Sequence, residues 1–140
     1  MPSRTETPSS SPGDPQPESL TFALTERQLD ERASVVAVEG ELDLTTAPRL
    51  KWILLDALQA GHSQLVLDLS RCSFMDSTAL GVLVGVNRGL DAGARLAIAC
   101  TRPNVLKIFE LSGMDGAFAL FATVDQALAY TRGRTAQVGG

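Results

Sequence analysis

Apolar and β-branched residues recur through residues 21–29 and 33–39, which predicts two β-strands. The polar residues Asp30, Glu31 and Arg32 lie between them and predict a turn, so the two strands form a hairpin. Residues 40–43 (Gly-Glu-Leu-Asp) then lead out of the sheet.

Beyond the hairpin the chain alternates between a helical and a strand period. The first helix begins after Thr45 or Thr46 as N-cap, has Pro48 in its first turn and ends at Gly61. Its apolar face consists of Leu50, Ile53, Leu54, Ala57 and Leu58. Further strands are expected at 64–69, 95–100 and 118–121, and further helices at 77–90, 103–112 (with Gly113 as C-cap) and 124–131. This order predicts an α/β fold, a mixed sheet that is mostly parallel beyond the first hairpin and has helices packed on it.

The two ends of the chain differ in composition from this middle part. Residues 1–19 hold five of the seven prolines and five serines, so we expect a disordered tail. The domain is expected to span residues 20–131, followed by a flexible C-terminus at 132–140. No apolar run approaches the roughly eighteen residues of a membrane-spanning helix, so membrane insertion is not expected.

Charge and rare residues exclude several classes of function. The net charge is −4 and the Lys and Arg residues form no cluster, which argues against direct binding of nucleic acid. Cys72 and Cys100 lie far apart and His62 is the single histidine, so neither a metal site nor a bound cofactor is expected. We interpret the cysteines as reduced thiols of a cytoplasmic protein.

One joint between a strand and a helix is unusual. In the stretch FMDSTALGVLVG, residues 74–85, either Asp76 or Ser77 can cap the helix that begins there. Ser77, Gly81 and Gly85 recur at i, i+4 and i+8, away from the apolar stripe of Ala79, Leu80, Leu83, Val84, Val86 and Leu90. Each glycine destabilises the helix by up to about 1 kcal/mol relative to alanine. We therefore expect the glycines to allow the close approach of either another protein or a neighbouring element of the same domain.

Three stretches together resemble a known family: VEGELDLTTAPRL at 38–50, LVLDLSRCSFMDSTALGVLV at 65–84, and IFELSGMDGAF at 108–118. Over residues 21–131 the chain resembles the STAS domain of bacterial anti-sigma factor antagonists. The resemblance implies a protein that is not itself an enzyme. Its unphosphorylated form binds an anti-sigma factor that is also a serine kinase and thereby frees the sigma factor. That kinase phosphorylates it, and a metal-dependent serine phosphatase resets it.

The resemblance also implies roles for particular residues. Ser77 matches the phosphorylated serine of the family, and Asp43 matches a loop acid near that serine. Thr78 is a second hydroxyl at the joint, so it could compete with Ser77 as acceptor. The full set expected to contact the partner is Asp43, Asp76, Ser77, Thr78, Gly81 and Gly85.

Two other functions deserve comparison with this one. A serine hydrolase would need a GxSxG elbow, but Met75 and Ala79 occupy the flanking positions, and His62 is the one available base. Hydrolysis is therefore not expected. The alternative that stays open is a STAS scaffold or accessory module of another signalling or transport complex, although such modules often lack the acceptor serine.

Overall fold

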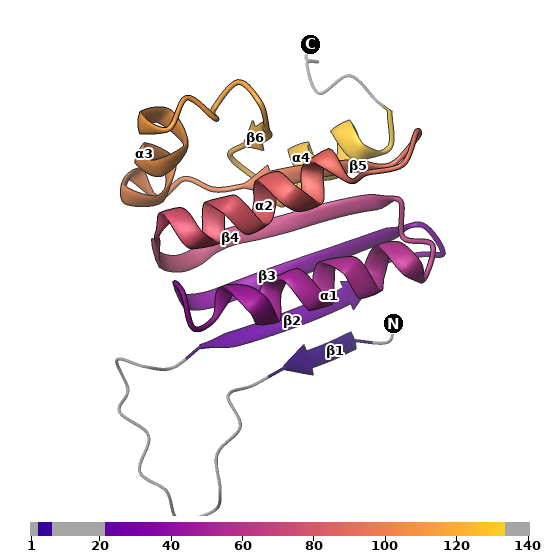
Figure 1. Ribbon diagram of the computed structural model, residues 1–140. Helices are drawn as coiled ribbons and strands as arrows, with labels where there is room; N and C mark the ends of the chain where they lie inside the picture. Colours follow the sequence, from indigo (N-terminus) through magenta and orange to yellow (C-terminus); the bar gives the residue numbers. More distant parts are fainter. Residues whose placement is uncertain (1–2, 7–21, 134–140) are drawn as a thin grey trace, which may run out of the picture.

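The computed structural model describes residues 3–6 and 22–133 (Figure 1). In chain order, the described strands are β1 (Ser3–Glu6), β2 (Ala23–Gln28), β3 (Ala33–Leu42), β4 (Gln64–Met75), β5 (Arg95–Ala99) and β6 (Ala119–Phe121). The described helices are α1 (Ala47–Gln59), α2 (Ser77–Arg88), α3 (Pro103–Leu111) and α4 (Val124–Thr131).

The strands form one sheet whose spatial order follows the chain, from β1 at one edge to β6 at the other. β2 pairs antiparallel with both β1 and β3, whereas β3, β4, β5 and β6 are parallel neighbours. The connections between these parallel strands contain α1, α2 and α3, and α4 follows the last strand. The predicted α/β fold, with a mixed sheet that is mostly parallel beyond the first hairpin, is confirmed.

The two faces of the sheet carry unequal cores. The larger core lies between one face and α1, α2 and α3, and includes Leu54, Leu67 and Phe109. The smaller core lies on the opposite face, which α4 covers (Figure 1). There Val66 and Ala97 pack with Ala127 and Leu128 of α4. The expected apolar stripe is buried at Ala79, Leu80, Leu83 and Val86 and half-buried at Val84, all in α2; Leu90 is also half-buried but follows the helix, which ends at Arg88 and not at the predicted residue 90.

Strands β3 and β4 extend beyond their predicted ends at residues 39 and 69. Two register shifts in the pairing of β3 with β4, each with one extra residue in β4, allow Gly40 to pair with Cys72, and Leu42 to pair with Met75. Such irregular pairing keeps exposed polar residues such as Ser73 inside a strand, so the sequence pattern hides it. The prediction that residues 40–43 leave the sheet was therefore wrong for the first three of them. As a result, the end of β3 lies directly beside the joint that precedes α2.

The N-terminal prediction needs a correction at Ser3–Glu6, where the structure has strand β1 in place of a disordered tail. Composition could not reveal this strand, because the outer edge of β2 offers unpaired backbone groups to any proline-free segment. The rest of the predicted tail, residues 1–2 and 7–19, lies outside the described residues, as do 134–140 of the predicted flexible C-terminus. The described part of that terminus includes Arg132, whose Nη2 lies 3.4 Å from Oδ2 of Asp30.

Among the described residues, no helix is both long enough and apolar enough to cross a lipid bilayer.

Candidate functional site

Asp76 is the N-cap of α2. Its backbone is extended (φ −107°, ψ 179°), and its Oδ1 accepts a hydrogen bond from the Ala79 N–H at 3.0 Å. Its carbonyl accepts the Leu80 N–H at 3.1 Å, and its own N–H donates to the Leu42 carbonyl at 3.1 Å. These bonds fix the start of α2 and fasten it to the end of β3.

Ser77 is the first residue of α2, and its side chain is exposed. Its hydroxyl has no hydrogen-bond partner within residues 3–6 and 22–133, because the capping bond belongs to Asp76. The backbone N–H groups of Ser77 and Thr78 also lack partners in that part of the chain, as expected for the first turn of a helix. The site therefore presents a free hydroxyl beside two free N–H donors, and Thr78 adds a second exposed hydroxyl.

Asp43 organises the turn that lies next to Ser77. Its Oδ1 accepts from the Thr45 hydroxyl at 2.7 Å, from the Thr45 N–H at 3.0 Å and from the Thr46 N–H at 3.1 Å. The bond from the Thr45 hydroxyl is the main cause that lowers the pKa of this carboxyl below its ordinary value. The Asp76 N–H is hydrogen-bonded to the Leu42 carbonyl. Asp43 follows Leu42 and Ser77 follows Asp76, so each of the two residues is one position from this bond. The chain thus brings these two predicted site residues to the same edge of the sheet.

The glycine row faces open space. Gly81 and Gly85 are exposed, and a Cβ built on either would meet no atom of another described element within 4 Å. The glycines therefore do not admit a neighbouring element of the same domain, which was one of the two open readings. They form one wall of a groove of about 470 Å³ between α1 and α2, whose lining residues are Lys51, Leu55, Thr78, Gly81, Val82, Gly85 and Val86.

Sequence reasoning missed four large apolar side chains that are exposed, one of which, Leu111 of α3, lies away from the joint. Leu44 lies in the Asp43 turn and is 69% exposed; Phe74, just before the joint, is 45% exposed; and Trp52 of α1 is 60% exposed. The Lys51 Nζ lies 5.7 Å from the centroid of the Trp52 ring. A helical projection of α1 would have revealed Trp52, because it falls off the face formed by Leu50, Ile53 and Leu54.

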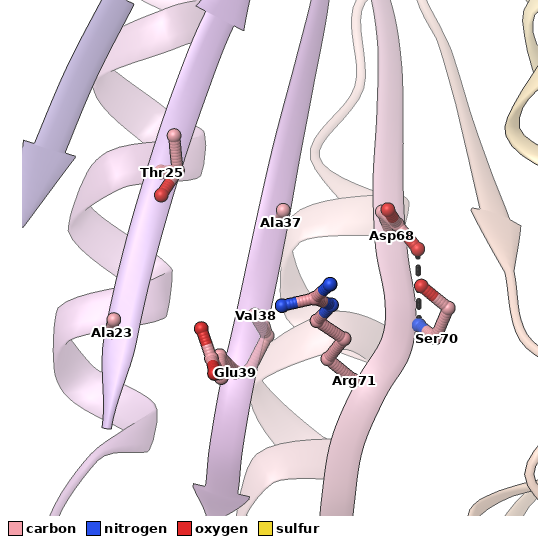
Figure 2. A pocket seen from close by; sticks show the side chains of 8 residues that line it. All are labelled: Ala23, Thr25, Ala37, Val38, Glu39, Asp68, Ser70 and Arg71. Carbon is pink, nitrogen blue, oxygen red and sulfur yellow. Dashed lines mark hydrogen bonds between the residues drawn. The ribbon is translucent and has the colours of Figure 1, made fainter. Parts of the chain in front are cut away.

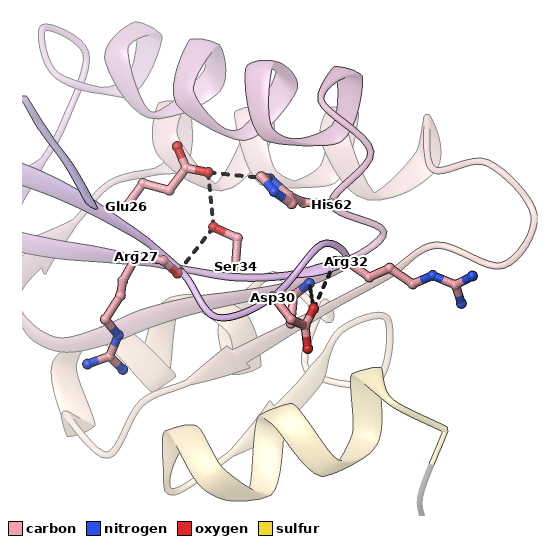
Figure 3. A network of polar contacts seen from close by, with 7 residues as sticks. Glu26, Arg27, Asp30, Arg32, Ser34 and His62 are labelled. Atoms are coloured by element: carbon pink, nitrogen blue, oxygen red, sulfur yellow. Dashed lines mark hydrogen bonds and ion pairs between the residues drawn. The ribbon is translucent and has the colours of Figure 1, made fainter. Parts of the chain in front are cut away.

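His62 is not a base for Ser77. It is buried, and its Nδ1 lies 3.7 Å from Oε2 of the buried Glu26, which also accepts a bond from the Ser34 hydroxyl at 3.0 Å (Figure 3). His62 precedes the twelve-residue strand β4 and Ser77 follows it. At about 3.3 Å per residue, roughly 35 Å separate the two. The structure therefore contains no serine–histidine pair at the joint.

A second hollow, of about 260 Å³, lies on the sheet away from α1 and α2. Figure 2 shows Glu39 and Arg71 projecting from neighbouring strands there, with Ala37 between β2 and β4. Asp68 accepts a hydrogen bond from the Ser70 N–H at 3.0 Å. Among the described residues, no three His, Cys, Asp or Glu side chains gather in a way that could hold a metal ion.

Comparisons with known proteins agree with this geometry. The STAS domain model matches residues 25–127. The anti-sigma-F factor antagonist RsfB of Mycobacterium tuberculosis is 26% identical over 117 residues, which are 84% of this chain and 93% of RsfB. An anti-sigma factor antagonist of Mycobacterium paratuberculosis has a structure with a TM-score of 0.75 and 29% identity, covering 80% of this chain and 95% of that one.

The anti-sigma factor antagonist SpoIIAA in its unphosphorylated form gives a TM-score of 0.68 at 28% identity, over 79% of this chain and 96% of SpoIIAA. The phosphorylated form of SpoIIAA, from Bacillus, gives a TM-score of 0.61 at 26% identity, over 78% of this chain and 99% of SpoIIAA. Because the family model spans well over half of the sequence, the chain belongs to the STAS domain family, and these relatives are anti-sigma factor antagonists.

Proposed function

We propose that this protein is an anti-sigma factor antagonist that is switched by phosphorylation of Ser77. In its unphosphorylated form it binds an anti-sigma factor that is also a serine kinase, and the sigma factor is released. The kinase transfers the γ-phosphoryl group of ATP to Oγ of Ser77, which yields ADP and a proton. A metal-dependent serine phosphatase hydrolyses the phosphate and restores the binding form. Sigma factors and ATP are cytoplasmic, so the protein would act there.

The observation that carries this proposal is that Asp76, and not Ser77, caps α2. A serine that capped α2 would have its hydroxyl committed to the backbone, but here the Asp76 carboxylate accepts that bond. The Ser77 hydroxyl is therefore exposed and free among the described residues, as a phosphate acceptor must be. The relatedness to SpoIIAA, which has a phosphorylated form, supports the same assignment.

The surroundings of Ser77 suit a protein partner. The row of Ser77, Gly81 and Gly85 has no bulky side chain, so a partner backbone can approach α2 closely. Exposed Leu44 and Phe74 lie on the two segments that meet beside the serine, and would offer apolar contact area. We infer that Asp43 acts by shaping the turn that carries Leu44, since its Oδ1 is engaged by Thr45 and Thr46.

Phosphorylation would weaken this contact through charge and bulk. Phosphoserine carries about −1.5 to −2 charges at neutral pH. Two negative charges about 6 Å from one partner carboxylate repel it by roughly 1.4 to 5.5 kcal/mol, for effective dielectric constants of about 80 to 20. Even the lower value is about a tenfold loss of affinity.

Phosphorylation is tested with purified anti-sigma factor kinases of the source organism, ATP and mass spectrometry. We expect one phosphate on the wild type, located at Ser77, and none on Ser77→Ala. Thr78→Val is the matched control, because it removes the neighbouring hydroxyl and keeps the shape of the side chain. A phosphate that persists in Ser77→Ala and disappears in Thr78→Val would assign the acceptor to Thr78 instead.

Binding to the same kinases tests the surface. Ser77→Ala should bind as tightly as the wild type, and Ser77→Glu should bind at least several-fold more weakly. Gly81→Arg should stay folded, because its Cβ meets open space, and should lose affinity. Gly116→Arg is the control, since Gly116 is also exposed with open space around it but lies outside the groove. Equal affinity of Gly81→Arg and the wild type would exclude the glycine row from the interface.

A further inference from the structure

The outer edge of β2 is covered by a strand of only four residues, β1. We propose that β1 is a guard strand, which keeps this edge from pairing with the β2 edge of a second copy of the chain. The inference concerns the opposite edge of the hairpin from β3 and does not depend on the function proposed for Ser77.

β2 would be a strong pairing edge if β1 were absent. Its six residues contain no proline, and its register with β3 runs from Ala23 to Gln28 without a shift. A regular, proline-free edge of this kind is what soluble proteins usually avoid exposing, because its free N–H and C=O groups template further pairing. The sequence of β1 differs from this in two respects: it has four residues instead of six, and Pro2 and Pro8 flank it. These are features of protected natural edges.

The geometry of β2 selects how two copies would pair. Identical strands related by a two-fold axis must run antiparallel, which is the direction in which β2 already accepts β1. Residues that lie opposite each other in a sheet must face the same side of it, and neighbouring residues of a strand face opposite sides. At the two-fold axis, a residue is therefore opposed by the same residue of the second copy. An axis at Glu26 would oppose two buried carboxylates, whereas an axis at Thr25 opposes two hydroxyls. We therefore place Thr25 opposite Thr25 of the second copy.

The side chain of Thr25 is accessible for a test of this register. It is half-buried and lines the hollow on the sheet face away from α1 and α2, beside Ala23 (Figure 2). In the intact chain Thr25 is opposite Thr5 of β1. Directly opposed Cα atoms of antiparallel strands lie about 4.5 to 5.5 Å apart, which is within the reach of a disulfide bond. The native Cys72 and Cys100 are both buried and do not compete.

The first experiment compares the full chain with a variant that lacks residues 1–6, by light scattering at matched concentrations. We expect particles with the mass of two truncated chains for the truncated variant, and of a single chain for the full-length protein. In the truncated background Thr25→Cys should form an interchain disulfide on mild oxidation. The control Ala23→Cys should not, because two such residues would lie about 14 Å apart in the Thr25-centred register, beyond disulfide reach.

A second pair of variants keeps the whole chain. Thr5→Cys combined with Thr25→Cys should close an intrachain disulfide and lock the protein as a single chain. Replacing Arg4 and Thr5 by proline should release β1, because adjacent N–H groups of a strand alternate in direction and one of these two faces β2. That variant should form dimers as the truncation does.

Three results would overturn the proposal. The truncated variant could keep the circular dichroism of the full chain and remain a single chain. The full-length protein could pair through Thr25→Cys as readily as the truncated one. The truncated variant and the variant with proline at positions 4 and 5 could both unfold, which would show that β1 is required for folding.

Discussion

Asp76 and Ser77 are adjacent, yet the structure predicts opposite responses to their replacement by alanine. Asp76→Ala removes the acceptor that lies 3.0 Å from the Ala79 N–H, so the first turn of α2 loses its cap. Loss of an N-cap costs about 1 kcal/mol, with a range of about 0.5 to 2 kcal/mol. For a domain of about 110 residues, that lowers Tm by roughly 4 °C. Ser77→Ala removes a hydroxyl without a partner among the described residues, so its effect on stability should stay within about 0.5 kcal/mol.

Urea and thermal unfolding of the two variants provide the measurement, with binding to an anti-sigma factor kinase measured in parallel. Asp76→Ser serves as the matched control, because serine is also a good N-cap and should recover most of the lost stability. We expect Asp76→Ala to be the less stable protein and Ser77→Ala to be the one that cannot be phosphorylated. If Ser77→Ala lowered Tm as much as Asp76→Ala does, the serine would be part of the cap, and the assignment of the cap to Asp76 alone would be wrong.

Three further predictions concern residues around the site and the core. Gly81→Ala should raise the free energy of unfolding by up to about 1 kcal/mol, because its Cβ would meet no atom of another described element within 4 Å; a lower Tm would indicate a contact outside the described residues. Asp43→Asn should be less stable than the wild type at pH 7. Because the folded pKa of Asp43 lies below its ordinary 3.8, this difference should vanish as the pH falls through that folded value; a gap that persists in acid would refute the charge-based cause. Cys72 should resist alkylation at neutral pH and react after unfolding in urea, because burial raises the pKa of its thiol to about 11; rapid labelling of the native protein, read by mass spectrometry, would contradict this.

Local periodicity was enough to predict most of the fold. The last helix was expected at 124–131 and occupies Val124–Thr131, because Thr123 caps it and its apolar spacing is regular. Likewise, α1 begins after Thr46, with Pro48 in its first turn. The Thr46 side chain does not cap that helix, since its hydroxyl accepts from the Asp43 N–H at 2.9 Å and donates to the Glu41 carbonyl at 2.8 Å.

Features that depend on partners distant in the sequence could not be predicted. The extension of β3 and β4 arises from pairing between Leu42 and Met75 across register shifts that no local pattern encodes. The sequence left open which of Asp76 and Ser77 caps α2, because both residue types are good caps and the geometry alone decides. The groove beside Gly81 requires α1 and α2 to be placed side by side, which only the assembled sheet does.

The position of Ser77 explains how one phosphate could change binding without changing the fold. A phosphate there would meet the free N–H groups of Ser77 and Thr78 and the positive end of the α2 dipole, an interaction of about 0.3 to 1 kcal/mol in its favour. The Asp76 carboxylate next to it opposes part of that gain, so the net effect on the folded domain is small. A docked partner carboxylate meets the same charge with a repulsion of roughly 1.4 to 5.5 kcal/mol at about 6 Å. The phosphate therefore changes the free energy of association more than it changes the free energy of folding, which is the condition for a switch that acts on binding while the domain stays folded.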